Sequence, residues 1–135
     1  MSNATETLIR SYYQAFNDRD WDVFFDLLTD DVVHDLNQGA RETGKDAFRR
    51  FMGRMNRAYA ERLADIVVMT SADGSRAAAE YVVHGTYLAT DEGLPEAKNQ
   101  TYVLPGGAFF EVRDGKVARV TNYYNLEDWL KQVKG

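Results

Sequence analysis

The chain has 135 residues, enough for one domain with a real hydrophobic core, and 44% of them are hydrophobic. Charged residues make up 27%, near the globular average, so a disordered chain is not expected. The formal net charge of −5 gives no support for a phosphate-binding surface. The absence of cysteine excludes disulfides, thiolate nucleophiles and cysteine-bound zinc.

The first part of the chain predicts helices. From the N-terminus, the expected elements are a helix over about residues 5–17, a short helix from residue 21, a strand over residues 32–36 and a helix over about residues 45–59. The first helix has apolar residues at three- and four-residue spacing, and Asn3 and Glu6 resemble a cap at its start. Asp20 is expected to cap the second helix. Thr43 and Asp46 have the spacing of a capping box for the third.

After about residue 63 the apolar pattern changes to period two, which predicts strands. The expected elements are strands over residues 63–70, 76–90, 101–113 and 116–125, a loop over residues 91–100 and a closing helix over residues 126–133. Three helices followed by an antiparallel meander imply a single α+β domain over residues 1–135. We expect a cone-shaped α+β barrel, with three N-terminal helices packed on a strongly curved, mainly antiparallel sheet. Such a cone leaves a cavity for an apolar ligand between the first helix and the sheet.

The expected cavity is apolar with a few hydrogen-bonding groups. Alternation along the strands sorts side chains onto two faces, and the charged residues identify the outer face. The polar residues expected inside are Tyr12, His34, Tyr81, Asn122 and Tyr124, within an apolar lining of Phe16, Val83, Phe110 and Val120. Asp35, His84 and Thr121 are expected on the opposite face. No carboxylate is expected inside the cavity.

His34 is the only group titrating near neutral pH that the pattern places in the cavity. As a base it would abstract a proton adjacent to a carbonyl, while Tyr12, Tyr124 or Asn122 donates to the developing enolate oxygen. The alternatives are a satisfied core histidine and a histidine that binds the polar end of a ligand. Two histidines on different faces argue against a metal site. No phosphate-binding loop or nucleotide fingerprint is present, so no cofactor is expected.

Three segments of the chain resemble a known family. They are Tyr12-Tyr13-Gln14-Ala15-Phe16-Asn17, Leu28-Thr29-Asp30-Asp31-Val32-Val33 and Phe110-Glu111-Val112-Arg113-Asp114-Gly115-Lys116-Val117. They are similar to SnoaL-like polyketide cyclases and ketosteroid isomerases, and most of all to the ketosteroid isomerase-related branch of the nuclear transport factor 2-like superfamily. The resemblance covers nearly the whole chain and implies a homodimer.

The resemblance does not extend to the acids that ketosteroid isomerases use. Those enzymes have a helix-one tyrosine and a protonated aspartic acid as oxyanion donors, and a first-strand aspartate as base. By resemblance Tyr12 falls at the position of the tyrosine, but Leu36 and Ala108 fall at the two acid positions. Asp35 is one residue from the base position and therefore points to the other face. A steroid isomerase or a standard cyclase is not expected.

Two functions are open. The first is a cofactor-free isomerase, cyclase or dehydratase that acts on a hydrophobic carbonyl compound with His34 as acid/base. The second is a non-catalytic ligand-binding or dimeric interaction domain on the same scaffold. The expected partners are a small hydrophobic molecule and a second copy of the chain. The copy would pack on the apolar side chains expected to point outward, which are Val82, Leu88, Phe109 and Val117.

Nucleic acid and membranes are not expected as partners. Five arginines between positions 49 and 62 form the candidate basic face, but Asp46 and Glu61 flank them, so a solvated helix face is expected instead. No stretch of sequence approaches the roughly 20 apolar residues that a membrane span needs. The first residues have no signal-peptide pattern, and a cytoplasmic location is therefore predicted.

Overall fold

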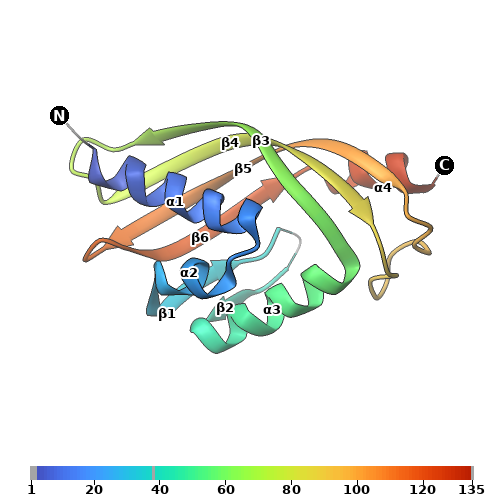
Figure 1. The fold of residues 1–135 in the computed structure, drawn as a ribbon, viewed down its shortest axis with the longest axis horizontal. Coiled ribbons are helices and arrows are strands. Elements are labelled where there is room, and N and C mark those ends of the chain that lie inside the picture. Colours follow the sequence, from blue (N-terminus) through green and yellow to red (C-terminus); the bar gives the residue numbers. More distant parts are fainter. Residues whose placement is uncertain (1–2, 38, 135) are drawn as a thin grey trace.

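The computed structural model describes residues 3–37 and 39–134. In chain order the elements are α1 (Ala4–Asp18), α2 (Trp21–Asp26), β1 (Leu28–Asp35), β2 (Arg41–Thr43), α3 (Lys45–Ala58), β3 (Tyr59–Thr70), β4 (Arg76–Tyr87), β5 (Thr101–Arg113), β6 (Lys116–Tyr124) and α4 (Leu126–Lys134) (Figure 1). The strands form one sheet in the order β2-β1-β6-β5-β4-β3. Neighbouring strands are antiparallel except β1 and β6, which are parallel. The predicted α+β class is confirmed.

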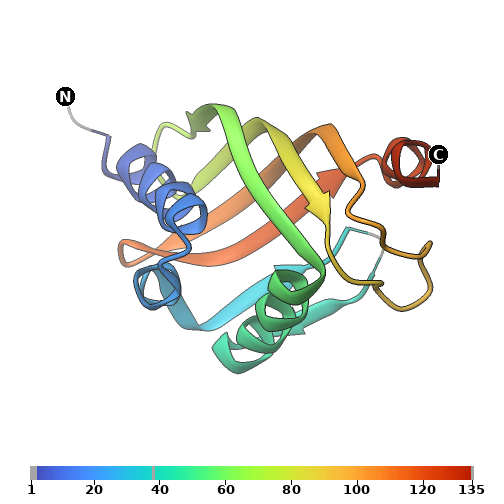
Figure 2. The ribbon, with the colours of Figure 1, turned by 45° about the vertical axis from the view of Figure 1, so that its right-hand side comes forward.

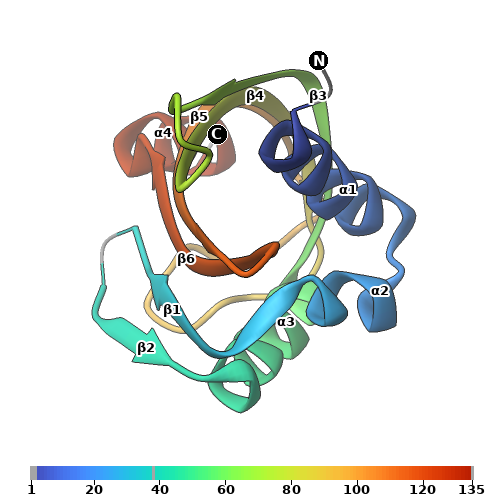
Figure 3. The same ribbon diagram turned by 90° about the vertical axis from the view of Figure 1, so that its left-hand side faces the viewer.

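The sheet curls around the interior of the molecule, and the helices cover its open side. In Figure 2 the strands β3 to β6 form the curved wall. In Figure 3, α1 and α2 lie opposite β6, and α3 lies beside β1. The pairing of β3 with β4 shifts register between Ala64 and Val67, where Asp65 has a φ of 54°. Such bulges bend a strand and increase its twist, which helps the sheet to curl. The predicted cone, with three N-terminal helices on a strongly curved sheet, is confirmed.

Two of the three predicted helix starts are confirmed. The side chain of Asn3 accepts a hydrogen bond from the backbone N–H of Glu6 at 3.1 Å, and Asp20 accepts from the N–H of Val23 at 3.3 Å. The capping box predicted for α3 is wrong. Gly44 is the N-cap, and no side chain caps this helix. The φ of Gly44 is +98°, a conformation that glycine adopts without strain, so the turn is set by the backbone.

Two strands differ from the prediction in ways that matter for the interior. β3 begins at Tyr59, directly after α3 and four residues before the predicted start. Glu61 therefore lies on a strand of the cone wall rather than in a charged connection. The three-residue strand β2 was not predicted, because so short a strand has no alternation to read. β2 pairs with β1 and places Glu42 directly opposite His34.

One residue predicted to face outward lies in the core. Val117 is 0% exposed, so its predicted place on the outer face is wrong. The register between β5 and β6 shifts at this point, since Glu111 pairs with Arg119 but Val112 pairs with Val117. The extra residue in β6 is a bulge that reverses the alternation. Val117 and Val120 consequently both point inward.

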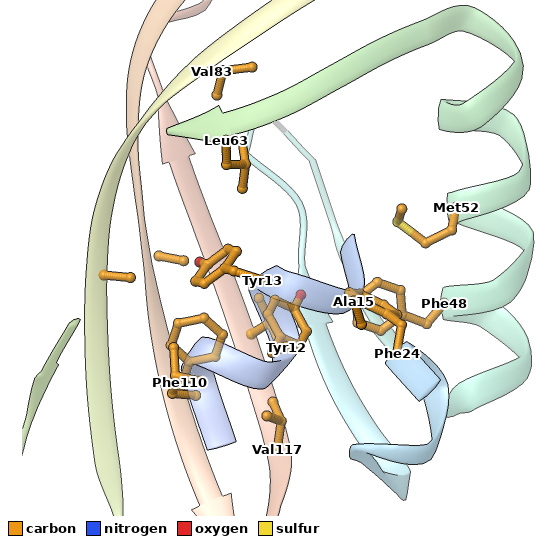
Figure 4. Close-up of a cluster of buried hydrophobic side chains, with 14 of the residues drawn as sticks. Tyr12, Tyr13, Ala15, Phe24, Phe48, Met52, Leu63, Val83, Phe110 and Val117 are labelled. Atoms are coloured by element: carbon orange, nitrogen blue, oxygen red, sulfur yellow. The ribbon is translucent and has the colours of Figure 1, made fainter. Parts of the chain in front are cut away.

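The core is continuous from α1 to the inner face of the sheet. It is rich in aromatic residues, and Figure 4 shows the ring of Tyr12 between Phe110 and Phe24. The ring centroids lie 5.5 Å apart for Tyr12 and Phe110 and 4.6 Å apart for Tyr12 and Phe24. Among the described residues, no helix is long and apolar enough to cross a membrane.

Candidate functional site

A cavity of about 510 Å³ lies between α1, α3 and the inner face of the sheet. Most of the predicted polar and apolar site residues line it. These are Tyr12, Phe16, His34, Tyr81, Val83, Asn122 and Tyr124. Phe110 is not among the lining residues, because it is 0% exposed and packs behind Tyr12. Val120 is also 0% exposed and belongs to the core.

His34 lies in the cavity wall between two aromatic rings. Its ring stacks parallel on Phe48 with centroids 4.2 Å apart, and meets Phe51 edge-on at 4.6 Å. The side chain is 2% exposed, and this burial lowers the pKa of His34 to about 4, although nearby Asp35 acts in the opposite direction. Burial disfavours a charged imidazolium. His34 is therefore neutral at neutral pH and able to accept a proton.

The nitrogen Nδ1 of His34 faces the carboxylate of Glu42. Nδ1 lies 3.9 Å from Oε1 of Glu42, too far for a hydrogen bond. Both atoms are buried, and neither has a hydrogen-bond partner in the described part of the chain. A proton on Nδ1 would point at this carboxylate and leave Nε2 with a free lone pair. Glu42 was missed from the sequence because its position depends on the pairing of β2 with β1.

Two neighbouring tyrosines of α1 also line the cavity. Tyr12 is 6% exposed and Tyr13 is 4% exposed. Burial, and to a lesser extent the nearby phenol of Tyr81, raises the pKa of both hydroxyls above the usual range. Both are therefore neutral hydrogen-bond donors. The hydroxyl of Tyr13 is buried and has no partner within residues 3–37 and 39–134. The sequence singled out Tyr12 and not Tyr13, although both belong to the same helix turn.

The cavity also contains carboxylates, contrary to the prediction that none lies inside. Glu61 and Asp91 both line it. The hydroxyl of Tyr102 donates to Glu61 Oε2 at 2.5 Å, and the hydroxyl of Tyr59 donates to Asp91 Oδ2 at 2.9 Å. Burial raises the pKa of Glu61, and the hydrogen bond from Tyr102 partly offsets this effect. Glu61 was missed because it follows a run of arginines that resembles an exposed helix face.

The segment after β4 forms part of the cavity wall. Asp91 and Leu94 line the cavity. The hydroxyl of Tyr87 donates to the carbonyl oxygen of Pro95 at 2.6 Å and accepts from the N–H of Asp91 at 2.9 Å. These bonds hold the segment against the end of β4. Tyr124, at the end of β6, also lines the cavity. It is 41% exposed, and its backbone N–H donates to the side chain of Asn37 at 3.1 Å.

The model of the SnoaL-like domain family matches residues 9–120 of the sequence. The chain belongs to the SnoaL-like family. No protein with a curated description matches this SnoaL-like chain significantly.

Several solved structures of similar sequence share the whole fold of this SnoaL-like domain. A proposed polyketide cyclase from Pseudomonas putida KT2440 is 64% identical, with a TM-score of 0.94 over 98% of this chain and 99% of that one. A proposed polyketide cyclase from Xanthomonas campestris pv. campestris is 59% identical, with a TM-score of 0.93 over 97% and 98%. A third, from Silicibacter sp. TM1040, is 50% identical, with a TM-score of 0.96 over 98% and 97%.

In this SnoaL-like domain, apolar residues occupy the two positions at which the resemblance implies acids. Leu36 lines the cavity, and Ala108 is 0% exposed. Asp35 points away from the cavity, as predicted, and binds Arg41 through two hydrogen bonds of 2.7 and 3.1 Å. It also accepts from the hydroxyl of Thr121 at 2.6 Å. The cavity is thus lined by His34 and by the carboxylates of Glu61, Asp91 and Glu92, while Glu42 lies behind His34.

The charged groups of the cavity are spread over its walls. Among the described residues, no three or more side chains of His, Cys, Asp and Glu gather in a way that would hold a metal ion. The cofactor-free site expected from the sequence stays a prediction.

Proposed function

We propose that this SnoaL-like domain binds a small hydrophobic carbonyl compound and acts on it as a cofactor-free isomerase, cyclase or dehydratase. The observation that carries the proposal is the neutral ring of His34 in the wall of an aromatic cavity of about 510 Å³, with Nδ1 turned toward Glu42 so that Nε2 is the base. A perturbed histidine in a cavity is a candidate functional group. The relatives named as proposed polyketide cyclases also favour a carbonyl compound as substrate.

In the proposed reaction His34 takes a proton from the carbon next to the carbonyl. The hydroxyl of Tyr12 donates to the oxygen as enolate charge develops, and Tyr13 offers a second donor. One such donor contributes roughly 3 kcal/mol in a transition state. A base with a pKa of about 4 suits this chemistry, since the aspartate base of ketosteroid isomerase has a pKa of about 4.6. Returning the proton from His34 to a different carbon would complete an isomerisation.

The remaining site residues have binding roles in this proposal. Phe16, Tyr81, Asn122 and Tyr124 contact the ligand from α1, β4 and β6. Phe110 supports the ring of Tyr12 from behind, with the two rings edge to face. Aromatic pairs of this kind fix ring orientation. The proposal therefore assigns Phe110 a positioning role.

The test is the exchange of α-protons of 2-tetralone into deuterated water, followed by NMR. This probe reports enolisation without knowledge of the natural substrate. We expect the protein to accelerate exchange and His34→Ala to remove about 100-fold or more of that acceleration. His84→Ala is the matched control, because His84 lies on the opposite face of β4 and should leave exchange unchanged. Equal exchange by His34→Ala and the parent chain would refute the catalytic role.

A non-catalytic ligand-binding domain is the second candidate. The apolar residues Leu36 and Ala108, at the two positions where the resemblance implies acids, favour it. Trp21 and Trp129 both line the cavity, so their fluorescence reports ligand binding directly. Saturable quenching by 2-tetralone without accelerated α-proton exchange would select this candidate.

We also propose that the chain forms a homodimer through the outer face of the sheet. Val103, Phe109 and Tyr123 are each at least half exposed there, and the rings of Phe109 and Tyr123 are 5.7 Å apart. Exposed apolar groups that gather on one face are typical of protein interfaces. Light scattering after size exclusion tests this, with Phe109→Ser expected to shift the chain toward monomer. The cytoplasmic location stays a prediction.

A further inference from the structure

The cavity has a second polar wall, opposite the one that holds His34. His34 lies on β1 and Glu61 on β3, near opposite ends of the strand order β2-β1-β6-β5-β4-β3. Both residues nevertheless line one cavity, because the sheet curls back on itself (Figure 3). A ligand in this cavity therefore has a hydrogen-bonding group available at two separate places.

The position of Glu61 depends on a contact that spans three strands. Glu61 of β3 pairs with Gly85 of β4, and Gly85 pairs with Tyr102 of β5. The ring of Tyr102 lies across Gly85, and its hydroxyl donates to Glu61 Oε2 at 2.5 Å. A Cβ at position 85 would lie 2.2 Å from Cζ of Tyr102, so only glycine leaves room for this ring. The chain thus carries a dedicated arrangement that holds one oxygen of Glu61.

The other oxygen of Glu61 is available to a ligand. In the part of the chain that the structure describes, Tyr102 is the one hydrogen-bond partner of the Glu61 side chain, and no ion pair involves it. Glu61 is partly buried and lines the cavity. Its second oxygen is not among the fully buried polar atoms that lack a partner in the described part of the chain, so it is accessible from the cavity. A ligand in the cavity can therefore form a hydrogen bond with it.

A hydroxyl group is the ligand chemistry that fits Glu61 best. An ionised carboxylate only accepts hydrogen bonds, whereas a neutral carboxyl group also donates one. An ammonium group would satisfy only the first form, and a carbonyl only the second. A hydroxyl both donates and accepts, so it suits Glu61 in either form. The surrounding wall is aromatic, with Tyr59, Tyr81 and Trp129 beside it in the lining.

We propose that Glu61 binds a hydroxyl group of the substrate, at the opposite end of the molecule from the carbonyl that His34 and Tyr12 engage. The substrate class is then a hydrophobic hydroxy-carbonyl compound, and Glu61 is the residue that selects the hydroxyl. This inference rests on the proposed binding of a carbonyl compound. It adds a specificity-determining residue on β3 to the groups on α1 and β1.

The test compares two ketones that differ in one hydroxyl, 2-tetralone and 6-hydroxy-2-tetralone, by quenching of tryptophan fluorescence. We expect the parent chain to bind the hydroxylated ketone about tenfold more tightly, and Glu61→Leu to reduce this ratio to about one. Glu80→Leu is the matched control, because Glu80 is exposed on the neighbouring strand. Gly85→Ala should lower the ratio as well, since the added Cβ displaces Tyr102 from Glu61.

The outcomes separate this inference from the proposed function. Unchanged affinity of Glu61→Leu for 2-tetralone shows that this variant is folded, and a ratio near one then supports the inference. A tenfold preference that persists in Glu61→Leu overturns it. Equal binding of both ketones by the parent chain, with α-proton exchange still dependent on His34, overturns the role of Glu61 alone. Failure of the parent chain to bind either ketone overturns both proposals.

Discussion

Polar side chains on the outer face of the sheet differ from those on its inner side in how fully they are hydrogen-bonded. On the outer face Asp35, Arg119 and Thr121 bond to one another and to neighbours. Asp35 accepts from Arg41 and Thr121, and Arg119 donates to Thr121 at 2.5 Å and to Glu111 at 2.7 Å. On the inner side Glu61 accepts from Tyr102, but Nδ1 of His34 and the hydroxyl of Tyr13 on α1 have no partner among the described residues.

This difference separates groups that stabilise the fold from groups that fit a ligand. Satisfied polar groups add modestly to stability, whereas buried groups without partners reduce it. His34 and Asp35 are neighbours on β1, yet they belong to opposite classes. Residues that lower stability are common where function requires them. Substitutions that break the outer hydrogen bonds should therefore lower stability. Removal of an inner group without a partner should raise stability and weaken ligand binding.

The largest expected effect is on the pH dependence of stability, through His34. Its pKa is about 4 in the folded chain and about 6.5 when unfolded. Between these values the unfolded chain binds the proton more readily, so stability is complete above pH 6.5 and falls as the pH falls toward 4. The expected loss is about 3 kcal/mol in free energy of unfolding. Urea denaturation at pH 7 and pH 4.5 should show most of this loss in the parent chain and little in His34→Leu.

A variant of the neighbouring residue serves as the control for this experiment. Asp35→Asn keeps His34 but removes the charge that raises its pKa, so the pH dependence between pH 4.5 and 7 should persist and become slightly steeper. An equal pH dependence in His34→Leu and the parent chain would contradict a buried neutral histidine.

The second effect is the stability that Asp35 provides on the outer face. Asp35→Asn should reduce the free energy of unfolding at pH 7 by about 2 kcal/mol, because it weakens charge-assisted bonds to Arg41 and Thr121. These bonds lower the pKa of Asp35 to about 2, and the hydrogen bond from Arg41 has the largest effect. The contribution is complete above pH 3.8 and is lost as the pH falls through about 2. Urea denaturation measures the difference.

The sequence predicted the fold well because its signals are local. Periodicity identified the helices and the long strands, and Asp114-Gly115 marked the last hairpin. The errors arise where pairing between distant segments decides the structure. Val117 was placed outward because a bulge that reverses alternation has no signature in single-strand periodicity. The capping box predicted at Thr43 is wrong, because the helix start is set by the backbone conformation of Gly44.

The site was predicted only in part, for the same physical reason. His34 and Tyr12 lie on elements whose inward faces follow from their own periodicity. Glu61 and Glu42 could not be found this way. The first depends on β3 starting directly after α3, and the second on a three-residue strand. Charged residues in an arginine-rich stretch are normally solvated, so composition pointed away from Glu61.

The third effect concerns Thr121, which lies between Asp35 and Arg119 in the hydrogen-bond network of the outer face. Thr121 accepts from Arg119 and donates to Asp35 through the same oxygen. Thr121→Val keeps the shape of the side chain but leaves two charged groups with one bond fewer each. We expect a loss of about 1 kcal/mol in free energy of unfolding, measured by urea denaturation. No loss would mean that the outer network contributes nothing through this hydroxyl.

The smallest effect has the opposite sign and compares two tyrosines of the cavity wall. Tyr13→Phe removes a buried hydroxyl that lacks a partner among the described residues, so stability should rise by up to about 1 kcal/mol. Tyr59→Phe is the control and should lose about 1 kcal/mol, because its hydroxyl binds Asp91 at 2.9 Å. If Tyr13 is a ligand donor, Tyr13→Phe should also bind 2-tetralone several-fold more weakly by fluorescence quenching. A gain in stability together with a loss of affinity is the result that a purely structural hydroxyl would not produce.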